Sequence, residues 1–286
     1  MRTLCSSGKT DQHVCPDRGA ISPQTAARAD WQLPAFRKHE FRAKQHRFCL
    51  CVFVINEGDR FRSQLARMEP LQQTVDVVIA DGGSDDGSTT PERLAAAGAR
   101  ALLVKTGPGR LSAQMRMALA WALEEGYEGI VVMDGNNKDD PSAVHRFIDA
   151  LENGYDHVQG SRYVPGGNGV NTPLLRHYGV TLVHAPLISL AAGFHYTDTT
   201  NGFRAYSGRM LLDPRVAPFR EVFNDYELHY YLAIRAARLG YRCCEVPVTR
   251  TYPPSDDTPT KIRGLRGNVR VLRTLLLAAA GRWNPN

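Results

Sequence analysis

The sequence predicts an α/β fold in which a mostly parallel central sheet carries helices on both faces. Two observations favour this fold. Strand-length apolar stretches alternate with stretches of helical periodicity from Phe48 onward, and polar, glycine-rich turns follow three of the strands. Such alternation is typical of parallel sheets, because a helix carries the chain back between neighbouring strands. With 286 residues, 43% of them hydrophobic and 22% charged, the chain has a globular composition and can bury a large core.

Each predicted element has a local signal. The first strand is an apolar run that ends at Asn56, and the second is rich in β-branched residues. The helix over 91–98 has proline in its first turn and glycine at its end, and the helix over 111–125 stops before Gly126. The predicted strands are 48–55, 75–80, 101–105, 130–133 and 157–160, and the predicted helices are 59–69, 91–98, 111–125 and 141–153.

Composition and charge divide the chain into three parts. Residues 1–46 lack periodicity and are expected to form a loosely ordered arm, 47–262 form the α/β domain, and 263–286 form a basic amphipathic helix or tail. Residues 1–48 carry a net charge of +5 and 261–286 of +6, which leaves −5 between them in a chain of +6. This distribution argues against a nucleic-acid partner, which requires a basic groove. The basic ends suit solubility, or attraction to phosphates and lipid head groups.

The sequence also predicts a compartment. Six cysteines without a Cys-x-x-Cys pattern indicate buried thiols in a reducing environment. Residues 1–10 lack the apolar core of a signal peptide, and the longest apolar stretch, 180–194, is interrupted by His184 and Pro186. That stretch is shorter than the roughly 20 residues that span a bilayer. We therefore expect a cytoplasmic protein, associated at most with the inner face of the membrane.

Polar turns at three strand ends predict a ligand site. They begin at Asn56-Glu57, at Asp81 and at Asp134. Turns favour these residue types in general, but ligands of such sheets bind beyond the carboxyl ends of the strands, where the three turns meet. The glycine patterns of a dinucleotide fold and of a P-loop are both absent from the sequence, which weighs against those two nucleotide sites.

The residue types in these turns suit a nucleoside diphosphate. Asp81 can accept hydrogen bonds from a nucleobase or a ribose, and Gly82 and Gly83 let the backbone approach a ligand closely. Asp134 and Asn136 supply two oxygen ligands of the kind that Mg²⁺ and Mn²⁺ prefer. Such an ion would neutralise the charge on a departing nucleoside diphosphate.

Several short motifs then follow one another along the chain. They are Asn56-Glu57, Asp81-Gly-Gly-Ser-Asp-Asp86-Gly-Ser, Met133-Asp134-Gly-Asn136, Gly160-Ser161-Arg162-Tyr163, Thr197-Asp198-Thr-Thr-Asn-Gly202-Phe203-Arg204 and Gly240-Tyr241…Glu245-Val246-Pro247-Val248. Their order and spacing resemble family 2 glycosyltransferases and are most similar to the dolichyl- and polyprenyl-phosphate mannosyltransferase branch. The resemblance spans about 48–262. It implies a GT-A fold, a nucleotide-diphosphate sugar donor and transfer with inversion at the anomeric carbon.

The resemblance also implies a role for each matching residue. On the acceptor side, Arg162 and Arg176 would hold an acceptor phosphate, for which the forked guanidinium is well suited, and Lys261 matches a family lysine. Arg204 would lie at the floor of the active site. The donor site would comprise Asn56, Glu57, Asp81, Gly83, Asp134, Asn136 and Lys138, with the metal on Asp134 and Asn136, and the candidate catalytic residues are Asp134, Asp198 and Asp225.

The sequence departs from the family pattern at four places. Gly82 stands where the family has a second acid, and Asn136 replaces the second acid of the metal motif. Lys138 stands where the branch often has glutamine, so that a cation there would replace part of the metal's charge or meet a different donor. The stretch 250–261, which ends at Lys261, is longer and richer in proline than the family's acceptor loop, and is otherwise a surface loop.

The sequence leaves open which chemical group of the acceptor receives the sugar. A phosphate acceptor is already ionised and needs no general base, whereas a hydroxyl acceptor needs a carboxylate within hydrogen-bond reach. Asp225 is the candidate base, and a helix N-cap is its competing interpretation. We therefore expect transfer to a polyprenyl phosphate. The alternatives are a soluble or glycan hydroxyl acceptor, a non-catalytic nucleotide-sugar binding protein and, more remotely, a nucleotidyltransferase.

The basic tail carries an apolar stripe at helical spacing. Leu265, Val269, Leu272 and Leu276 recur beside several arginines. Such a helix rests on a membrane interface, packs on the protein's own core, or pairs with a second subunit in a homodimer.

Overall fold

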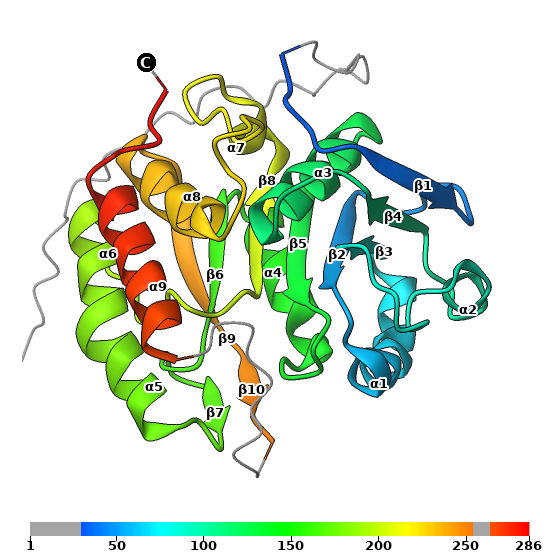
Figure 1. Ribbon diagram of the computed structural model, residues 1–286, viewed down its shortest axis with the longest axis horizontal. Coiled ribbons are helices and arrows are strands. Elements are labelled where there is room, and N and C mark those ends of the chain that lie inside the picture. The colour runs from blue at the N-terminus through cyan, green and yellow to red at the C-terminus, as the bar shows by residue number, and fades with distance from the viewer. Residues whose placement is uncertain (1–29, 254–263, 286) are drawn as a thin grey trace, which may run out of the picture.

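The computed structural model describes residues 30–253 and 264–285, and the side chains of 264–268 are not described. Its centre is an eight-stranded sheet in the order β1-β4-β3-β2-β5-β8-β6-β9 (Figure 1). β1 and β8 run antiparallel to their neighbours and the other strands share one direction, which confirms the predicted mostly parallel sheet. β7 and β10 pair in parallel as a separate small sheet.

The elements predicted between residues 48 and 161 are all present, with ends that differ by at most three residues, and the predicted helix over 141–153 begins as a 3-10 turn. The strands are β1 (Phe36–Glu40), β2 (Phe48–Val54), β3 (Asp76–Asp81), β4 (Ala101–Lys105), β5 (Gly129–Asp134), β6 (His157–Ser161), β7 (Asn168–Val170), β8 (Arg204–Ser207), β9 (Cys243–Pro247) and β10 (Thr249–Thr251). The α-helices are α1 (Gly58–Met68), α2 (Pro91–Ala96), α3 (Leu111–Glu124), α4 (Val144–Glu152), α5 (Leu174–Gly179), α6 (Ala185–Ala192), α7 (Gly208–Leu212), α8 (Glu227–Arg238) and α9 (Gly264–Ala279). Short 3-10 turns cover Glu69–Gln73 and Pro141–Ala143, and a π-helical turn, Val180–His184, joins α5 to α6.

The arm predicted over 1–46 needs a correction in the part that the structure describes. β1 pairs along β4 at the edge of the sheet, and the ring of Trp31 lies 4.1 Å from that of Phe219, centroid to centroid. No apolar run marks β1, because an edge strand exposes most of its side chains and here carries charged ones. Residues 1–29 lie outside the described residues.

The central strand β2 is buried along its whole length, because helices cover both faces of the sheet there. Alternate side chains of β2 point to opposite faces and join two separate apolar clusters. Cys49, Cys51 and Phe53 pack with α3, α7 and α8, while Leu50 and Val52 pack with α1, α2 and α4. Helices on both faces, as predicted, therefore enclose the strands.

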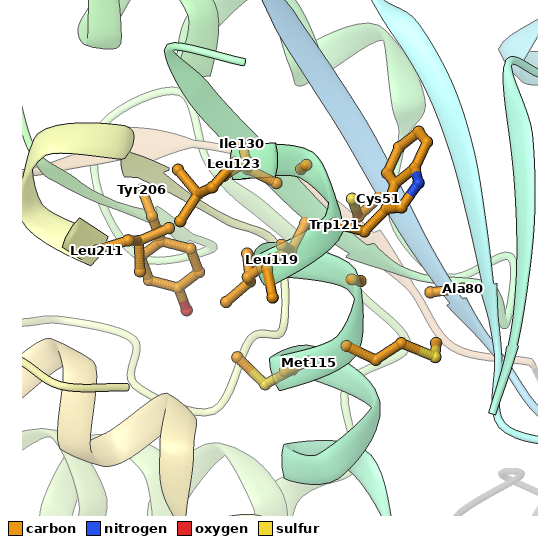
Figure 2. Close-up of a cluster of buried hydrophobic side chains, with 14 of the residues drawn as sticks. Cys51, Ala80, Met115, Leu119, Trp121, Leu123, Ile130, Tyr206 and Leu211 are labelled. Atoms are coloured by element: carbon orange, nitrogen blue, oxygen red, sulfur yellow. The ribbon is translucent and has the colours of Figure 1, made fainter. Parts of the chain in front are cut away.

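Helix α3 lies inside the first of these clusters. Figure 2 shows Trp121 of α3 on the side of Cys51, and Leu123 of the same helix toward Tyr206 and Leu211. Small and apolar residues on every side of α3 let the helix fit between the sheet and α8. It is consequently buried from Ser112 to Leu123.

The polar side chains of α3 fasten it to the edge of the sheet where the site forms. The amide nitrogen of Gln114 donates to the main-chain oxygens of Val54 and Ala80, at 3.1 and 2.6 Å, and so joins the carboxyl ends of β2 and β3. Arg116 donates to the main-chain oxygen of Phe223 at 2.9 Å. Because buried polar groups are costly when unpaired, these bonds fix the position of α3.

Helix α9 packs on the protein through residues other than the predicted stripe. Leu275 and Ala278 are buried against α6 and α8, whereas Val269, Leu272 and Leu276 are 57%, 40% and 50% exposed. The side chain of Leu265 lies outside the described residues. Within the described ranges, no helix has both the length and the apolar character that crossing a bilayer requires.

We predict that Leu50→Ala destabilises the protein by about 2–5 kcal/mol, because it leaves a cavity in a fully buried strand. Leu190→Ala is the matched control, since that leucine is 78% exposed, and we expect it to change the free energy of unfolding by less than about 0.5 kcal/mol. Urea unfolding monitored by circular dichroism measures both. Equal losses in the two variants would contradict the burial of β2.

Candidate functional site

A cavity of about 500 Å³ lies at the carboxyl ends of β2, β3 and β5, at the predicted edge of the sheet. This volume is in the range of small-molecule sites. The basic side chains that line it outnumber the acidic ones and come from six separate segments of the chain. The basic residues are Lys105, Arg110, Lys138, Arg176, Arg204 and Arg250, and the acidic ones are Glu57 and Asp134. The cavity is therefore suited to an anion.

Asp134 is the last residue of β5 and turns its carboxylate into this cavity. The carboxylate oxygen Oδ2 accepts from Nη2 of Arg250 at 3.3 Å and from the amide nitrogen of Asn136 at 3.4 Å. Opposite it, a Cβ on Gly202 would lie 2.9 Å from Oδ1. Only glycine lets the backbone of the 199–202 loop come this close, so the loop forms the wall of the cavity facing Asp134.

Arg250 lies between two carboxylates. Besides Asp134, its guanidinium donates to Asp139, whose carboxylate is fully buried behind it. Burial raises the pKa of Asp139, with the charge of Arg250 working in the other direction. Burial would lower the pKa of Arg250, but the two carboxylates outweigh burial and raise that pKa. Arg250 therefore stays charged at the base of the cavity.

Three basic side chains lie around the ring of Tyr252. Nζ of Lys138 lies 5.4 Å from its centroid, and the guanidinium carbons of Arg176 and Arg250 lie 5.6 and 5.9 Å away. An aromatic face attracts cations, and this arrangement brings three segments distant in sequence to one point. Burial lowers the pKa of Lys138 to about 8, and the charge of Arg250 contributes to the same shift.

The predicted metal ligands do not fit a divalent ion. Arg250 already lies between Asp134 and Asp139, the place that an ion bridging two carboxylates would take. The amide of Asn136 presents its N–H group to Asp134, and its oxygen accepts from the backbone of Lys138 at 3.3 Å. Among the residues that the structure describes, no group of three or more His, Cys, Asp or Glu side chains could hold a metal.

The predicted nucleotide residues Asn56, Asp81 and Gly83 shape the loop beside the cavity. The Asp81 carboxylate accepts from the backbones of Gly83 and Ser84, from the Ser84 hydroxyl and from the Thr89 hydroxyl, at 2.7–3.0 Å. Gly83 has a φ of +97°, which a side chain would strain. Asn56 accepts from the backbone of Asp85 at 2.9 Å. None of these three residues lines the cavity, whereas Gly82 and Glu57 do. Contact of Asn56, Asp81 and Gly83 with a nucleotide therefore stays a prediction.

Arg162 and Asp198 form a buried ion pair behind the cavity wall. Nε and Nη2 of Arg162 donate to the two oxygens of Asp198 at 2.7 and 2.9 Å, and both side chains are at most 1% exposed. Nη1 of Arg162 donates to the hydroxyl of Tyr252 at 2.9 Å. Arg162 therefore positions Tyr252. Contact of Arg162 with an acceptor phosphate and catalysis by Asp198 both stay predictions.

Arg204 is buried and lines the cavity, and its place at the floor of an active site stays a prediction. Its guanidinium donates to the main-chain oxygens of Thr199, Asn201 and His229, at 2.6–3.0 Å. These bonds connect the 199–202 loop to α8. Burial, with the charge of Arg204, lowers the pKa of His229 well below its usual value, so this imidazole stays neutral.

Asp225 lies outside the residues that line the cavity. Its carboxylate pairs with Arg270 at 3.0 Å and with Arg110 at 3.7 Å. The buried Glu227 holds the surrounding turn by accepting the backbone N–H groups of Asn224, Asp225 and Tyr226. Asp225 is therefore no N-cap of α8, and its role as a base stays a prediction.

The structure thus brings six of the predicted residues to the cavity, and Lys261 lies outside the described residues. Sequence reasoning missed Arg250, Lys105 and Gln114. Lys105 had a usable signal, since it ends a predicted strand at the same edge of the sheet. The predicted residues that line the cavity are Glu57, Asp134, Asn136, Lys138, Arg176 and Arg204.

Comparison with known proteins places this geometry in context. The family model described as glycosyl transferase family 2 matches residues 49–214. Undecaprenyl-phosphate mannosyltransferase of Micrococcus luteus is 30% identical over 230 residues, which cover 80% of this chain and 92% of that protein. Polyprenol monophosphomannose synthase of Mycolicibacterium smegmatis is 30% identical over 72% of this chain and 77% of that protein.

Solved structures share the fold. Glucosyl-3-phosphoglycerate synthase from Mycobacterium tuberculosis, crystallised with Mn²⁺, UDP and glucosyl-3-phosphoglycerate, superposes with a TM-score of 0.58. Its sequence is 19% identical, and the match covers 84% of this chain and 81% of that one. This likeness concerns the fold alone and confirms the GT-A architecture.

We predict that Asp198→Asn destabilises the protein by about 3–5 kcal/mol, because it leaves the charge of Arg162 buried without its partner. Asp59→Asn is the matched control, since Asp59 is 90% exposed and pairs with Arg62 at the surface, where such pairs contribute about 1 kcal/mol at most. Chemical denaturation measures both variants. A loss no greater than in the control would show that the pair at Asp198 has access to water.

Proposed function

Because this chain belongs to glycosyl transferase family 2, we propose that it transfers a sugar from a nucleoside diphosphate to a polyprenyl phosphate, with inversion at the anomeric carbon. One observation carries the proposal: the cavity is lined by basic side chains, and it adjoins an apolar surface of helices that contain no acidic residue. The names of the two bacterial relatives point to the same class of acceptor.

The donor occupies the side of the cavity formed by β2, β3 and β5. Its nucleoside lies near Glu57 and Gly82, where the loop held by Asp81 lets the backbone approach. Its diphosphate lies at the end of β5, near Asp134 and the basic side chains around Tyr252. No step of the transfer is assigned to Mg²⁺ or Mn²⁺, because Arg250 takes the position between the two carboxylates.

The acceptor phosphate attacks the anomeric carbon from the opposite side. An oxygen of the ionised phosphate forms the new bond while the bond to the diphosphate breaks, so no proton has to be removed. Arg176 of α5 lines the cavity and supplies forked donors for that phosphate. Asp225 is not needed as a base in this reaction, which agrees with its pairing to Arg110 and Arg270.

Helices α5, α6 and α9 form the surface beside this phosphate site. In Figure 1 they lie together at one end of the sheet, and α2 lies at the other end. Leu174, Tyr178, Leu182 and Leu190 recur at multiples of four residues and are 56–78% exposed. We call this surface, with Leu175, Val183, Val269, Leu272 and Leu276, the apolar face.

The charge around the apolar face suits a bilayer with anionic lipids. Neither the segment 164–193 nor α9 contains an acidic residue, whereas both carry arginine. Arg176 belongs to α5 and lines the cavity, so the face continues into the phosphate site. We therefore propose that the bilayer covers the apolar face and that the isoprenoid chain of the acceptor lies along it. A second copy of the chain is the competing occupant.

We predict that the protein transfers label from a nucleotide sugar to a short polyprenyl phosphate, so that label partitions into organic solvent. A panel of labelled nucleotide sugars then identifies the sugar. Arg176→Ala should lower kcat/KM roughly 10- to 100-fold, chiefly through KM for the acceptor, because a hydrogen bond to a charged group contributes about 1.5–3 kcal/mol. Arg93→Ala on exposed α2 is the control and should leave transfer unchanged.

Two outcomes would contradict the proposed acceptor. Label that enters only a water-soluble product would indicate a hydroxyl acceptor and would make Asp225 the residue to mutate. Binding of nucleotide sugar without release of nucleoside diphosphate, for any acceptor, would indicate a non-catalytic binding protein.

We predict further that the protein sediments with vesicles that contain anionic phospholipid, and that Leu175→Glu weakens this binding by roughly tenfold or more. Burying one leucine side chain contributes about 1.5–3 kcal/mol, which the substitution removes. Ala95→Glu adds the same charge on exposed α2, at the far end of the sheet, and should have little effect. A dimer in solution that Leu175→Glu dissociates, together with unchanged vesicle binding, would assign the apolar face to a second subunit.

A further inference from the structure

The segment after β5 and the strand β10 form one unit around buried charges. The backbone of Asp140 donates to the main-chain oxygen of Thr249 at 3.0 Å, and the backbone of Thr251 donates to that of Lys138 at 2.7 Å. These two bonds flank Arg250 and place its guanidinium against Asp134 and Asp139. The position of Arg250 is thus fixed by main-chain pairing as well as by its ion pairs.

The charges of this unit leave an excess of positive charge facing the cavity. Arg250 pairs with the fully buried Asp139 and with Asp134, and Lys138 and Arg176 line the same cavity, so that these three basic side chains stand against two carboxylates. A divalent ion added here would meet three basic side chains close by, and like charges repel strongly where water is scarce. A diphosphate, by contrast, finds several donors already directed into the cavity.

The two residues of the predicted metal motif agree with this charge pattern. Asn136 brings no charge, and its amide hydrogens face the carboxylate of Asp134 rather than open space. Lys138, two residues further, is 7% exposed and lines the cavity near the ring of Tyr252. The segment after β5 therefore presents a neutral side chain and a basic one next to Asp134.

We propose that Lys138 and Arg250 bind the diphosphate of the sugar donor in the place of a divalent ion, so that donor binding and transfer need no metal. This inference rests on the proposed function, because it concerns the same donor site. As the bond between the anomeric carbon and the diphosphate breaks, its electron pair stays on the departing phosphate oxygen. Lys138 and Arg250 stabilise the added negative charge there, while the acceptor phosphate forms the new bond.

Calorimetric titration of UDP and of GDP into the full-length protein tests the proposal without relying on activity. We expect at least one of the two to bind after treatment with EDTA, with an affinity that added Mn²⁺ changes by no more than about twofold. Transfer from the nucleotide sugar should likewise persist in EDTA.

Variants of Lys138 separate its charge from its shape. Lys138→Gln should weaken binding of the nucleoside diphosphate about 10- to 100-fold, because it removes a charge-assisted contact, and should weaken binding of the free nucleoside much less. Lys138→Arg should retain most of the affinity. Lys38→Gln on β1, an exposed lysine that does not line the cavity, is the matched control and should bind as the unchanged protein does.

A double variant tests directly whether the cation acts in the place of a metal. Asn136→Asp combined with Lys138→Gln introduces an acid and removes the cation, so we expect binding of the nucleoside diphosphate that recovers only when Mn²⁺ is added. Thermal melting of each variant verifies that it is folded. Lys138→Gln that binds both diphosphates normally in EDTA would overturn the proposal.

The remaining outcomes separate this inference from the proposed function. Binding and transfer that EDTA abolishes and Mn²⁺ restores in the unchanged protein would overturn the inference, while the glycosyltransferase function would stand. Failure to bind UDP, GDP or any nucleotide sugar, with or without Mn²⁺, would overturn both.

Discussion

A buried carboxylate just after β5 is the constraint on which the cavity depends. Asp139 is fully buried, and burial together with the nearby charge of Asp134 raises its pKa, so that it needs a cation beside it to stay ionised. Arg250 supplies that cation, and it can do so only because β10 pairs with the segment after β5. The small sheet of β7 and β10 is consequently part of the site, although it lies apart from the main sheet.

Strand β10 also positions Tyr252, the residue that follows it, beside a second group of charged side chains. Its hydroxyl accepts from Arg162, which is held by Asp198, while its ring faces Lys138 and Arg176. Arg162 and Asp198 therefore act on the cavity through Tyr252 rather than by lining it. The sequence motif identifies the arginine and the acid. Whether such a residue contacts a ligand or supports another side chain depends on its burial, which the motif does not reveal.

The sequence predicts local structure well where burial is continuous. The apolar patterns of β2, β3 and α3 run over whole elements and so predict them, and a cavity lies at the carboxyl ends of the strands, where the sequence predicts a ligand site. β1 and β10 were missed, since an edge strand and a three-residue strand bury too few side chains to leave a pattern. Arg250 was missed for a related reason, because its partners are more than a hundred residues away in the chain. The face of α9 that packs inward was also not predictable, since both sides of that helix are apolar.

The arrangement of the basic side chains follows from the reaction under the proposed function. Donor and acceptor are both anions, and each must approach the same anomeric carbon, so their mutual repulsion has to be screened on both sides. Arg250 comes from β10 and Lys138 from the segment after β5, on the donor side, whereas Arg176 comes from α5, which begins the apolar face. A cation that is part of the chain keeps its position when the nucleoside diphosphate leaves, whereas a metal ion bound partly through phosphate oxygens loses ligands at that moment. Under the proposed function, the cations at Tyr252 therefore keep their places while one donor is exchanged for the next, which suits an acceptor that is held in place by a bilayer.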